Sequence, residues 1–222
     1  MPASDSAQPV VETSAQPAPD ATGTYLGRRI APTMSHEGAD WLTRPERESE
    51  EKASVMLEAL DLRPGDVACD LGAGNGFHTL EMAKRVAPTG RVLAVDIQPE
   101  MLTLLEGRAK AAGITNVETI LGASADPKLP RGACDLVLLA DVYHELDDPQ
   151  GMLAHLGDAL SPRGRLALLE FRGEDPNVPI KPEHKMTKAQ ANKELTANGF
   201  VLVRSFDDLP WQHLLFYAPK KR

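Results

Sequence analysis

Several features that mark other classes of protein are scarce in this sequence. Its 222 residues include only two cysteines, and aromatic residues make up 5%. Two cysteines are too few for a small secreted scaffold held by several disulfides, and no apolar run approaches the roughly 20 residues of a membrane-spanning helix. Acidic residues outnumber basic ones by 32 to 24, for a net charge of −8. Because phosphate binding needs a basic face, no nucleic-acid partner is expected, and no membrane partner either.

The first 24 residues differ in composition from the rest. They contain no lysine, arginine or aromatic residue, but four prolines, five alanines and six serines or threonines. Such a segment cannot bury enough apolar surface to offset its ordering entropy, so residues 1–24 are expected to form a disordered tail ahead of one domain, residues 25–222. The segment lacks the cationic start and apolar block of a secretory signal, which favours a cytoplasmic location.

Short apolar strands and helices alternate through most of the domain. Thr43 and Glu46 match a capping box ahead of a first helix. Strands separated by helices pair in parallel, which predicts a doubly wound α/β sheet covered on both faces. The two cysteines, Cys69 and Cys134, lie on or beside predicted strands and are expected to be small core residues without a redox role. The predicted strands are 67–71, 91–96, 117–121, 136–140 and 166–171, and the predicted helices lie near 77–87, 99–112 and 149–160.

The last third of the chain breaks this alternation. A helix capped by Thr187 ends at Asn198-Gly199. Two strands follow, 200–206 and 212–218, and the five residues between them cannot hold a crossover helix. These two strands should therefore pair antiparallel. The predicted fold is a mainly parallel, seven-stranded sheet with a C-terminal antiparallel hairpin.

The most informative stretch lies between the first predicted strand and its helix. It reads Asp70-Leu71-Gly72-Ala73-Gly74-Asn75-Gly76, and Asp96 ends the next strand. Glycine permits positive φ and a close approach of the backbone to a ligand, while a strand-end carboxylate can accept hydrogen bonds from ribose hydroxyls. A dinucleotide loop would need its third glycine at position 77, which is Phe77. The acid ahead of the glycines suits a cationic ligand better than a diphosphate.

These motifs resemble those of class I S-adenosylmethionine-dependent methyltransferases, from about Thr43 to the C-terminus. Val95-Asp96-Ile97 resembles the ribose-binding motif, and the run from Cys134 to Asp141 resembles the fourth-strand motif beside the methyl donor. The resemblance implies a Rossmann-like methyltransferase fold with S-adenosylmethionine as cofactor and a small-molecule methyl acceptor. It implies that Asp70 and the loop Gly72, Ala73, Gly74, Asn75 and Gly76 hold the methionine part, Asp96 the ribose, Ile97 and Met101 the adenine, and Asp141 the region of the donor.

The adenine contact departs from the family pattern. Many relatives carry Gly-Asp-Ala after the third strand, whereas this chain has Gly122-Ala123-Ser124-Ala125-Asp126. Ser124, Asp126 or backbone groups are the alternatives for binding the adenine amino group.

Candidate acceptor residues follow strands four and five, where open α/β sheets bind ligands. His144 could act as a general base and Tyr143 could orient the acceptor; the alternative is that both only line or pack the loop. Asp141 and Glu170 could approach each other, but a third ligand with suitable spacing is not evident. No metal is therefore expected, and Glu170 is expected to pair with Arg172 or with solvent.

Three further segments have two readings each. The loop 173–186 carries Lys181, His184 and Lys185, which suit an anionic acceptor or simple solvation. Residues 25–42 either cover the donor site or pack as a strap. Trp211 and His213 either line the cleft or are structural.

Two rival functions remain beside methyl transfer. One is an NAD-dependent Rossmann oxidoreductase, which Phe77 and the terminal hairpin disfavour. The other is a non-catalytic S-adenosylmethionine-binding module, which the loop does not distinguish from an enzyme.

Overall fold

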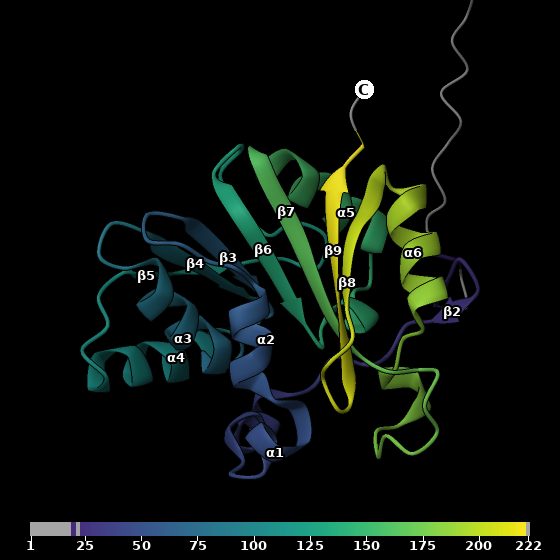
Figure 1. Ribbon diagram of the computed structural model, residues 1–222, viewed down its shortest axis with the longest axis horizontal. Helices are drawn as coiled ribbons and strands as arrows, with labels where there is room; N and C mark the ends of the chain where they lie inside the picture. Colours follow the sequence, from purple (N-terminus) through teal and green to yellow (C-terminus); the bar gives the residue numbers. More distant parts are fainter. Residues whose placement is uncertain (1–18, 21–22, 221–222) are drawn as a thin grey trace, which may run out of the picture.

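The computed structural model describes residues 19–20 and 23–220 (Figure 1). The tail predicted for residues 1–24 lies mostly outside these described residues. Its last residue, Thr24, pairs with Arg29 in a small antiparallel sheet of β1 (Thr24–Tyr25) and β2 (Arg28–Arg29). No helix in the described part of the chain is long and apolar enough to cross a membrane.

The central sheet confirms the predicted fold. Its seven strands lie in the order β5-β4-β3-β6-β7-β9-β8. All neighbours pair in parallel except β9, which runs antiparallel to both β7 and β8. The strands are β3 (Val67–Leu71), β4 (Arg91–Asp96), β5 (Val117–Leu121), β6 (Cys134–Ala140), β7 (Leu160–Phe171), β8 (Phe200–Phe206) and β9 (Gln212–Pro219).

The helices after the first strand also follow the prediction. Thr187 caps the last helix, since its Oγ1 accepts a hydrogen bond from the backbone N–H of Gln190. Figure 1 shows α3 and α4 beside β3 to β5, and α6 beside β8. The helices are α3 (Phe77–Val86), α4 (Pro99–Ala111), α5 (Pro149–Ala159) and α6 (Lys188–Ala197), with short 3-10 turns η1 (His36–Thr43), η2 (Tyr143–Glu145) and η3 (Pro182–His184).

The first helix differs from the expected one. It is divided into α1 (Arg47–Glu51) and α2 (Ala53–Ala59) by Lys52, which has a left-handed backbone with φ 52°. Thr43 forms no capping box, because it ends η1 and its hydroxyl donates to the Asp40 carbonyl. The break separates α1, which faces the cavity described below, from α2, which packs on the sheet.

Alternate residues of each strand enter different cores, as the pleat of a sheet requires. On β4, Leu93 and Val95 face the core that contains α5 and α6, while Val92 faces the core that contains α2 and α3. Ala94 packs with Leu105 of α4 on the latter side. The sheet is therefore covered by helices on both faces.

The two cysteines correct an expectation. Cys69 on β3 and Cys134 on β6 are joined by a disulfide, with their Cα atoms 6.1 Å apart. Both residues are fully buried, as predicted, but they are a covalent link between neighbouring strands and not independent apolar side chains. Nothing in the sequence indicated this pairing, since the two cysteines are 65 positions apart.

Candidate active site

A cavity of about 530 Å³ lies at the carboxyl ends of β3, β4 and β6. The order of the strands reverses here: the chain adds β4 and β5 on one side of β3 and continues with β6 on the other, and open α/β sheets bind ligands at such a point. The volume is in the range of about 300–1,000 Å³ that is usual for small-molecule pockets. Its walls come from the loop after β3, the end of β4, the segment after β6, the N-terminal segment and the loop around Ile180.

Two glycines bring the backbone of the first loop close to this cavity. Gly72 has φ 71°, and a Cβ on it would lie 2.4 Å from Cγ2 of Val142. Gly74 has φ 54°, and a Cβ there would lie 2.7 Å from Cδ1 of Leu42. No larger residue fits either position without displacement, so the close approach predicted from the glycines is present. Both residues line the cavity.

Asp96 is anchored by backbone N–H groups. Its Oδ2 accepts from the N–H of Gly74 and its Oδ1 from the N–H of Gln98, each at 2.9 Å. Burial raises the pKa of this carboxyl, although the backbone hydrogen bonds act in the opposite direction. The carboxylate lines the cavity at the end of β4, at the position expected for a ribose-binding acid.

The structure divides the other predicted donor residues into two groups. Ile97, Met101 and Ser124 line the cavity, whereas Asp126 does not and pairs with Lys128. Asp70 does not reach the cavity, because its Oδ2 accepts from the hydroxyl of Thr79 at 2.6 Å beneath the loop. Ala73, Asn75 and Gly76 are likewise not among the lining residues; they support the loop from behind.

Asn75 shows how that support works. Its amide nitrogen donates to the Ala39 carbonyl at 2.9 Å, and its Oδ1 accepts from the Arg108 guanidinium at 2.8 Å. The side chain therefore ties the glycine loop to the N-terminal segment and to α4, instead of contacting a ligand.

Asp141 enters the cavity from the end of β6 in a left-handed conformation, with φ 54°. Its Oδ2 accepts from the Gln212 amide at 2.6 Å, while its buried Oδ1 has no partner among the described residues. Burial raises the pKa of this carboxyl well above its usual value, and the nearby carboxylates of Glu51 and Glu170 add to the effect. An unpartnered buried acceptor of this kind fits a ligand with positive charge or N–H groups.

His144 and Glu170 form a buried pair across the ends of β6 and β7. Nδ1 of His144 lies 2.6 Å from Oε2 of Glu170. Burial lowers the pKa of the imidazole, but Glu170 opposes this and the net shift is upward. The expected pairing of Glu170 with Arg172 is wrong, because Arg172 instead donates to the carbonyls of Asp207 and Leu209.

Tyr143 is placed differently from His144. Its side chain is fully buried, and it packs in the core that contains α5 and α6. The guanidinium of Arg28 lies over its ring, 5.5 Å from the centroid. Tyr143 does not line the cavity, so the structure gives no support to a role in orienting the acceptor.

Two further residues lie on the acceptor side of the cavity: the sequence pointed to His184, as part of a loop that suits an anionic acceptor, but not to Glu145. Glu145 follows His144 and lines the cavity, and burial raises the pKa of its carboxyl to about 7 although His144 opposes the shift. His184, on the loop predicted to be functional or solvated, lies with Nδ1 3.1 Å from Nε2 of His144. This contact could not be predicted from the sequence, because His144 and His184 are 40 residues apart. Lys181 of the same loop also lines the cavity, whereas Trp211 and His213 do not.

The comparisons with known proteins agree with this geometry. A family model described as "Methyltransferase domain" matches residues 62–214, which is more than half of the chain. The chain belongs to this family. The match contains the glycine loop, Asp96, Asp141 and His144 of this methyltransferase domain. It leaves the rival reading of an NAD-dependent oxidoreductase without support, while the class I methyltransferase fold is confirmed.

Individual relatives differ in what they methylate. Nocamycin O-methyltransferase from Saccharothrix syringae is 33% identical over 116 residues, covering 52% of this chain and 41% of the relative. The ubiquinone/menaquinone biosynthesis C-methyltransferase UbiE from Hydrogenovibrio crunogenus is 33% identical over 116 residues, covering 52% and 46%. The methyltransferase thus spans about half or less of the curated relatives it matches.

A solved structure matches over more of the chain. A SAM-dependent methyltransferase from Aquifex aeolicus superimposes with a TM-score of 0.78 at 23% identity, covering 83% of this chain and 98% of the other. At this identity the similarity establishes the fold and not the acceptor. The family and this fold imply S-adenosylmethionine as the methyl donor.

The N-terminal segment of the methyltransferase covers the cavity, one of the two alternatives for residues 25–42. Thr33, Met34, Trp41 and Leu42 line it. Gln98 fastens the segment twice, since its side chain accepts from the N–H of His36 at 2.8 Å and donates to the carbonyl of Met34 at 2.9 Å. The cover and the end of β4 are therefore held together beside Asp96.

Arg47 on α1 adds a buried cation to the cavity wall. It donates to Glu51 at 2.8 Å and to the Leu42 carbonyl at 2.7 Å, and its guanidinium lies 3.2 Å from Nε2 of His78. Burial and Arg47 keep the pKa of His78 well below its usual value. Arg47 and Glu51 are four residues apart, a spacing typical of an ion pair on one face of a helix.

Proposed function

We propose that this protein transfers a methyl group from S-adenosylmethionine to a small-molecule acceptor. The observation that carries the proposal is the pair of acids in the cavity: Asp96, anchored by backbone N–H groups, and Asp141, with one buried oxygen unpartnered. A cationic donor with ribose hydroxyls and an ammonium group complements both carboxylates. A nicotinamide dinucleotide would bring a diphosphate into the same acidic surroundings.

Different residues of the cavity bind the different parts of the donor. Asp96 accepts hydrogen bonds from the ribose hydroxyls, the backbone at Gly72 and Gly74 gives room for the methionine part, and Asp141 faces its positive charge. Ile97 and Met101 supply apolar surface for adenine, with Ser124 beside them. The bound donor supplies an electrophilic methyl group: its C–S bond breaks as the bond from the methyl carbon to the acceptor forms, leaving a thioether.

The acceptor is placed at the other end of the cavity, against His144, Glu145 and His184. The N-terminal segment and the loop with Lys181 close over this end, which favours a small molecule over a folded protein. Enclosure aligns the acceptor for in-line displacement and excludes water. The role of His144 as a general base stays a prediction. Its Nδ1 is held by Glu170, which leaves Nε2 directed toward Nδ1 of His184.

Calorimetry and a transfer assay test the proposal together. The purified protein should bind S-adenosylmethionine and not NADH, and it should label a compound when given methyl-tritiated donor and a metabolite extract. Binding of NADH alone would overturn the donor assignment. Donor binding without any labelled product across fractionated extracts would instead support the non-catalytic binding module. Comparing the metabolites of a deletion strain and its parent would then identify the acceptor.

A further inference from the structure

Three side chains at the acceptor end of the cavity direct their ligand atoms to one point. Nε2 of His144 and Nδ1 of His184 are 3.1 Å apart, and each lies 3.8 Å from Oε1 of Glu145. The three residues come from η2 and η3, which are 40 residues apart in sequence but in contact in the fold. Two imidazoles and one carboxylate meeting in this way are a set of metal ligands.

We propose that His144, Glu145 and His184 bind one divalent transition-metal ion. Metal–ligand bonds of about 2.1 Å at angles between octahedral and tetrahedral place neighbouring ligand atoms about 3.0–3.4 Å apart. The two imidazole nitrogens already meet this spacing. Glu145 needs to approach by only a few tenths of an ångström, and its Oε2 is held at 3.3 Å by the backbone N–H of Met34.

Glu170 gives this site a feature common to metal centres. It lies 2.6 Å from Nδ1 of His144, on the side of the ring away from the cluster, and is itself fully buried. A carboxylate that accepts the Nδ1–H of a histidine fixes the ring and leaves the lone pair of Nε2 free for a metal. Glu170 is therefore a positioning residue for the proposed site.

The ligand types indicate which ions fit. Imidazole nitrogen suits Zn²⁺, Fe²⁺, Co²⁺ and Ni²⁺, whereas Mg²⁺ and Ca²⁺ prefer sites made of oxygen atoms. Three protein ligands on one side leave coordination positions open to the cavity. This reverses the expectation from sequence that no metal is bound, which depended on the missing third ligand.

The inference rests on the proposed function and adds a substrate class to it: acceptors with an oxygen or nitrogen donor that can bind the ion. Held by His144, Glu145 and His184, the ion would favour loss of the proton from an acceptor hydroxyl to solvent before the cavity closes, and would so supply the oxygen nucleophile for methyl transfer. His144 then acts as a ligand, and its Nε2 is not available as the general base.

Metal titration of the full chain tests the site without relying on turnover. Chelator-treated protein is titrated with Co²⁺, whose visible absorption reports nitrogen coordination, then with Zn²⁺ in competition, and with Mg²⁺ as a negative control. We expect one equivalent of Co²⁺ or Zn²⁺ to bind, and His184→Ala to weaken binding at least about 100-fold. His155→Ala is the matched control, because His155 is exposed on α5 and outside the cluster.

A second variant and a second ligand distinguish loss of the metal site from misfolding and from failure of the proposed function. Glu170→Gln should weaken metal binding by about 10- to 100-fold while leaving a folded protein. S-adenosylmethionine affinity, measured by calorimetry on metal-free protein, should change little in His184→Ala. Metal binding that is absent from the wild type, or equal in wild type and His184→Ala, overturns the inference. If the metal-free protein still binds the donor and transfers methyl groups at the full rate, the proposed function stands and the role of the metal in binding the acceptor is overturned.

Discussion

The backbone N–H of Gly74 donates a hydrogen bond of 2.9 Å to Oδ2 of Asp96, joining the glycine loop to the end of β4. The N–H of Gln98 binds the other oxygen at the same distance, and Gln98 in turn holds the N-terminal cover. One carboxylate thus binds the loop through Gly74 and the residue that precedes α4, and it lines the cavity.

Asp96→Ala should weaken binding of S-adenosylmethionine by about 1–3 kcal/mol, because a charged hydrogen-bond acceptor is lost from a buried site. Calorimetric titration measures the effect. Glu100→Ala is the control, since Glu100 is exposed on the first turn of α4. This variant should bind the donor with the affinity of the wild type. Unchanged affinity in Asp96→Ala would remove Asp96 from the donor site.

Gly72→Ala should destabilise the fold and narrow the cavity. An alanine at φ 71° is strained by about 1–2 kcal/mol, and its Cβ would lie 2.4 Å from Cγ2 of Val142, which adds an overlap of typically about 1–3 kcal/mol. The free energy of unfolding in urea and the affinity for S-adenosylmethionine should both fall.

Two variants distinguish the backbone strain of Gly72→Ala from the steric overlap of its Cβ with Val142. Gly132→Ala carries the backbone strain alone, because Gly132 has φ 67° and nothing lies within 4 Å of the added Cβ. Gly72→Ala with Val142→Ala removes much of the overlap and should recover part of the lost stability. Equal losses for Gly72→Ala and Gly132→Ala would show that Val142 moves aside freely.

The fold was largely readable from the sequence because each strand and helix carries a local signal. Short apolar runs between helices indicated parallel strands, and the five residues between 206 and 212 forced the hairpin. The break at Lys52 was not readable, since nothing in the lysine itself favours a left-handed backbone. The disulfide between Cys69 and Cys134 depends on strand neighbours that only the sheet order reveals.

The site residues that lie at or just after strand ends could be predicted from the sequence. Contacts that form only when distant segments fold together could not. Gly72, Gly74 and Asp96 follow strand ends, so topology alone placed them in the cavity. The contact of His144 with His184 needs the loop after β7 to return across β6, which no spacing rule predicts. Asp70 looked like a ligand contact, but the hydroxyl of Thr79 holds it beneath the loop.

Asp70 should make stability depend on pH. Burial raises the pKa of its carboxyl to about 6, against the lowering effect of Thr79, whereas an unfolded chain has the usual value near 3.8. The folded state therefore binds the proton more tightly, and the stability this contributes is present below about pH 4 and lost as pH rises towards 6. Asp70→Asn, which cannot ionise, should gain stability over the wild type across this interval, by up to about 3 kcal/mol.

Urea unfolding of both proteins between pH 4 and pH 8 measures this difference. The gain of Asp70→Asn should rise from pH 4 to about pH 6 and then stay constant, because Asp70 is ionised in both states above that pH. Asp126→Asn is the control, since hydrogen bonds from Lys128 keep the pKa of the Asp126 carboxyl below its usual value, so that it is mostly ionised in both states across this range. A gain that is the same at every pH would show that Asp70 titrates normally.

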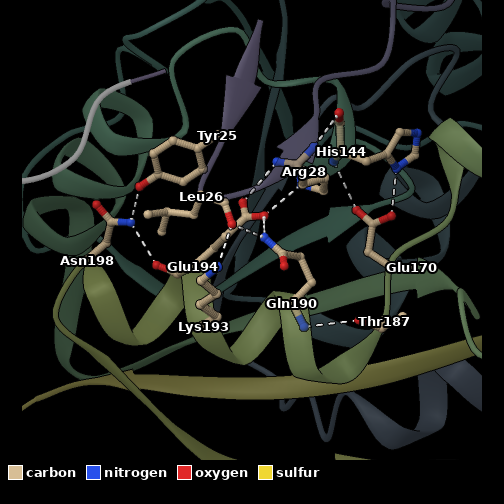
Figure 2. A network of polar contacts seen from close by, with 10 residues as sticks. All are labelled: Tyr25, Leu26, Arg28, His144, Glu170, Thr187, Gln190, Lys193, Glu194 and Asn198. Atoms are coloured by element: carbon tan, nitrogen blue, oxygen red, sulfur yellow. Dashed lines mark hydrogen bonds and ion pairs between the residues drawn. The ribbon is translucent and has the colours of Figure 1, made fainter. Parts of the chain in front are cut away.

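Arg28 fastens the N-terminal cover to the body of the domain (Figure 2). Its Nε and one terminal nitrogen donate to the two oxygens of Glu194 on α6 at 2.7 and 2.9 Å, and the other donates to the carbonyl of His144 at 2.9 Å. The Glu194 side chain is fully buried. Arg28 therefore links the cover, α6 and the turn that carries His144.

Arg28→Ala should lower the free energy of unfolding by about 3–5 kcal/mol, because it leaves the buried carboxylate of Glu194 without its cation. Arg28→Ala combined with Glu194→Gln should recover part of this loss, since the uncompensated charge is then gone while Gln190 can still donate to the amide oxygen. Urea unfolding measures the stability of both variants. Arg29→Ala is the control, because Arg29 is next to Arg28 in the chain and its side chain is exposed. Equal stability of Arg28→Ala and Arg29→Ala would show that the bidentate pair contributes nothing and that other contacts hold the cover in place.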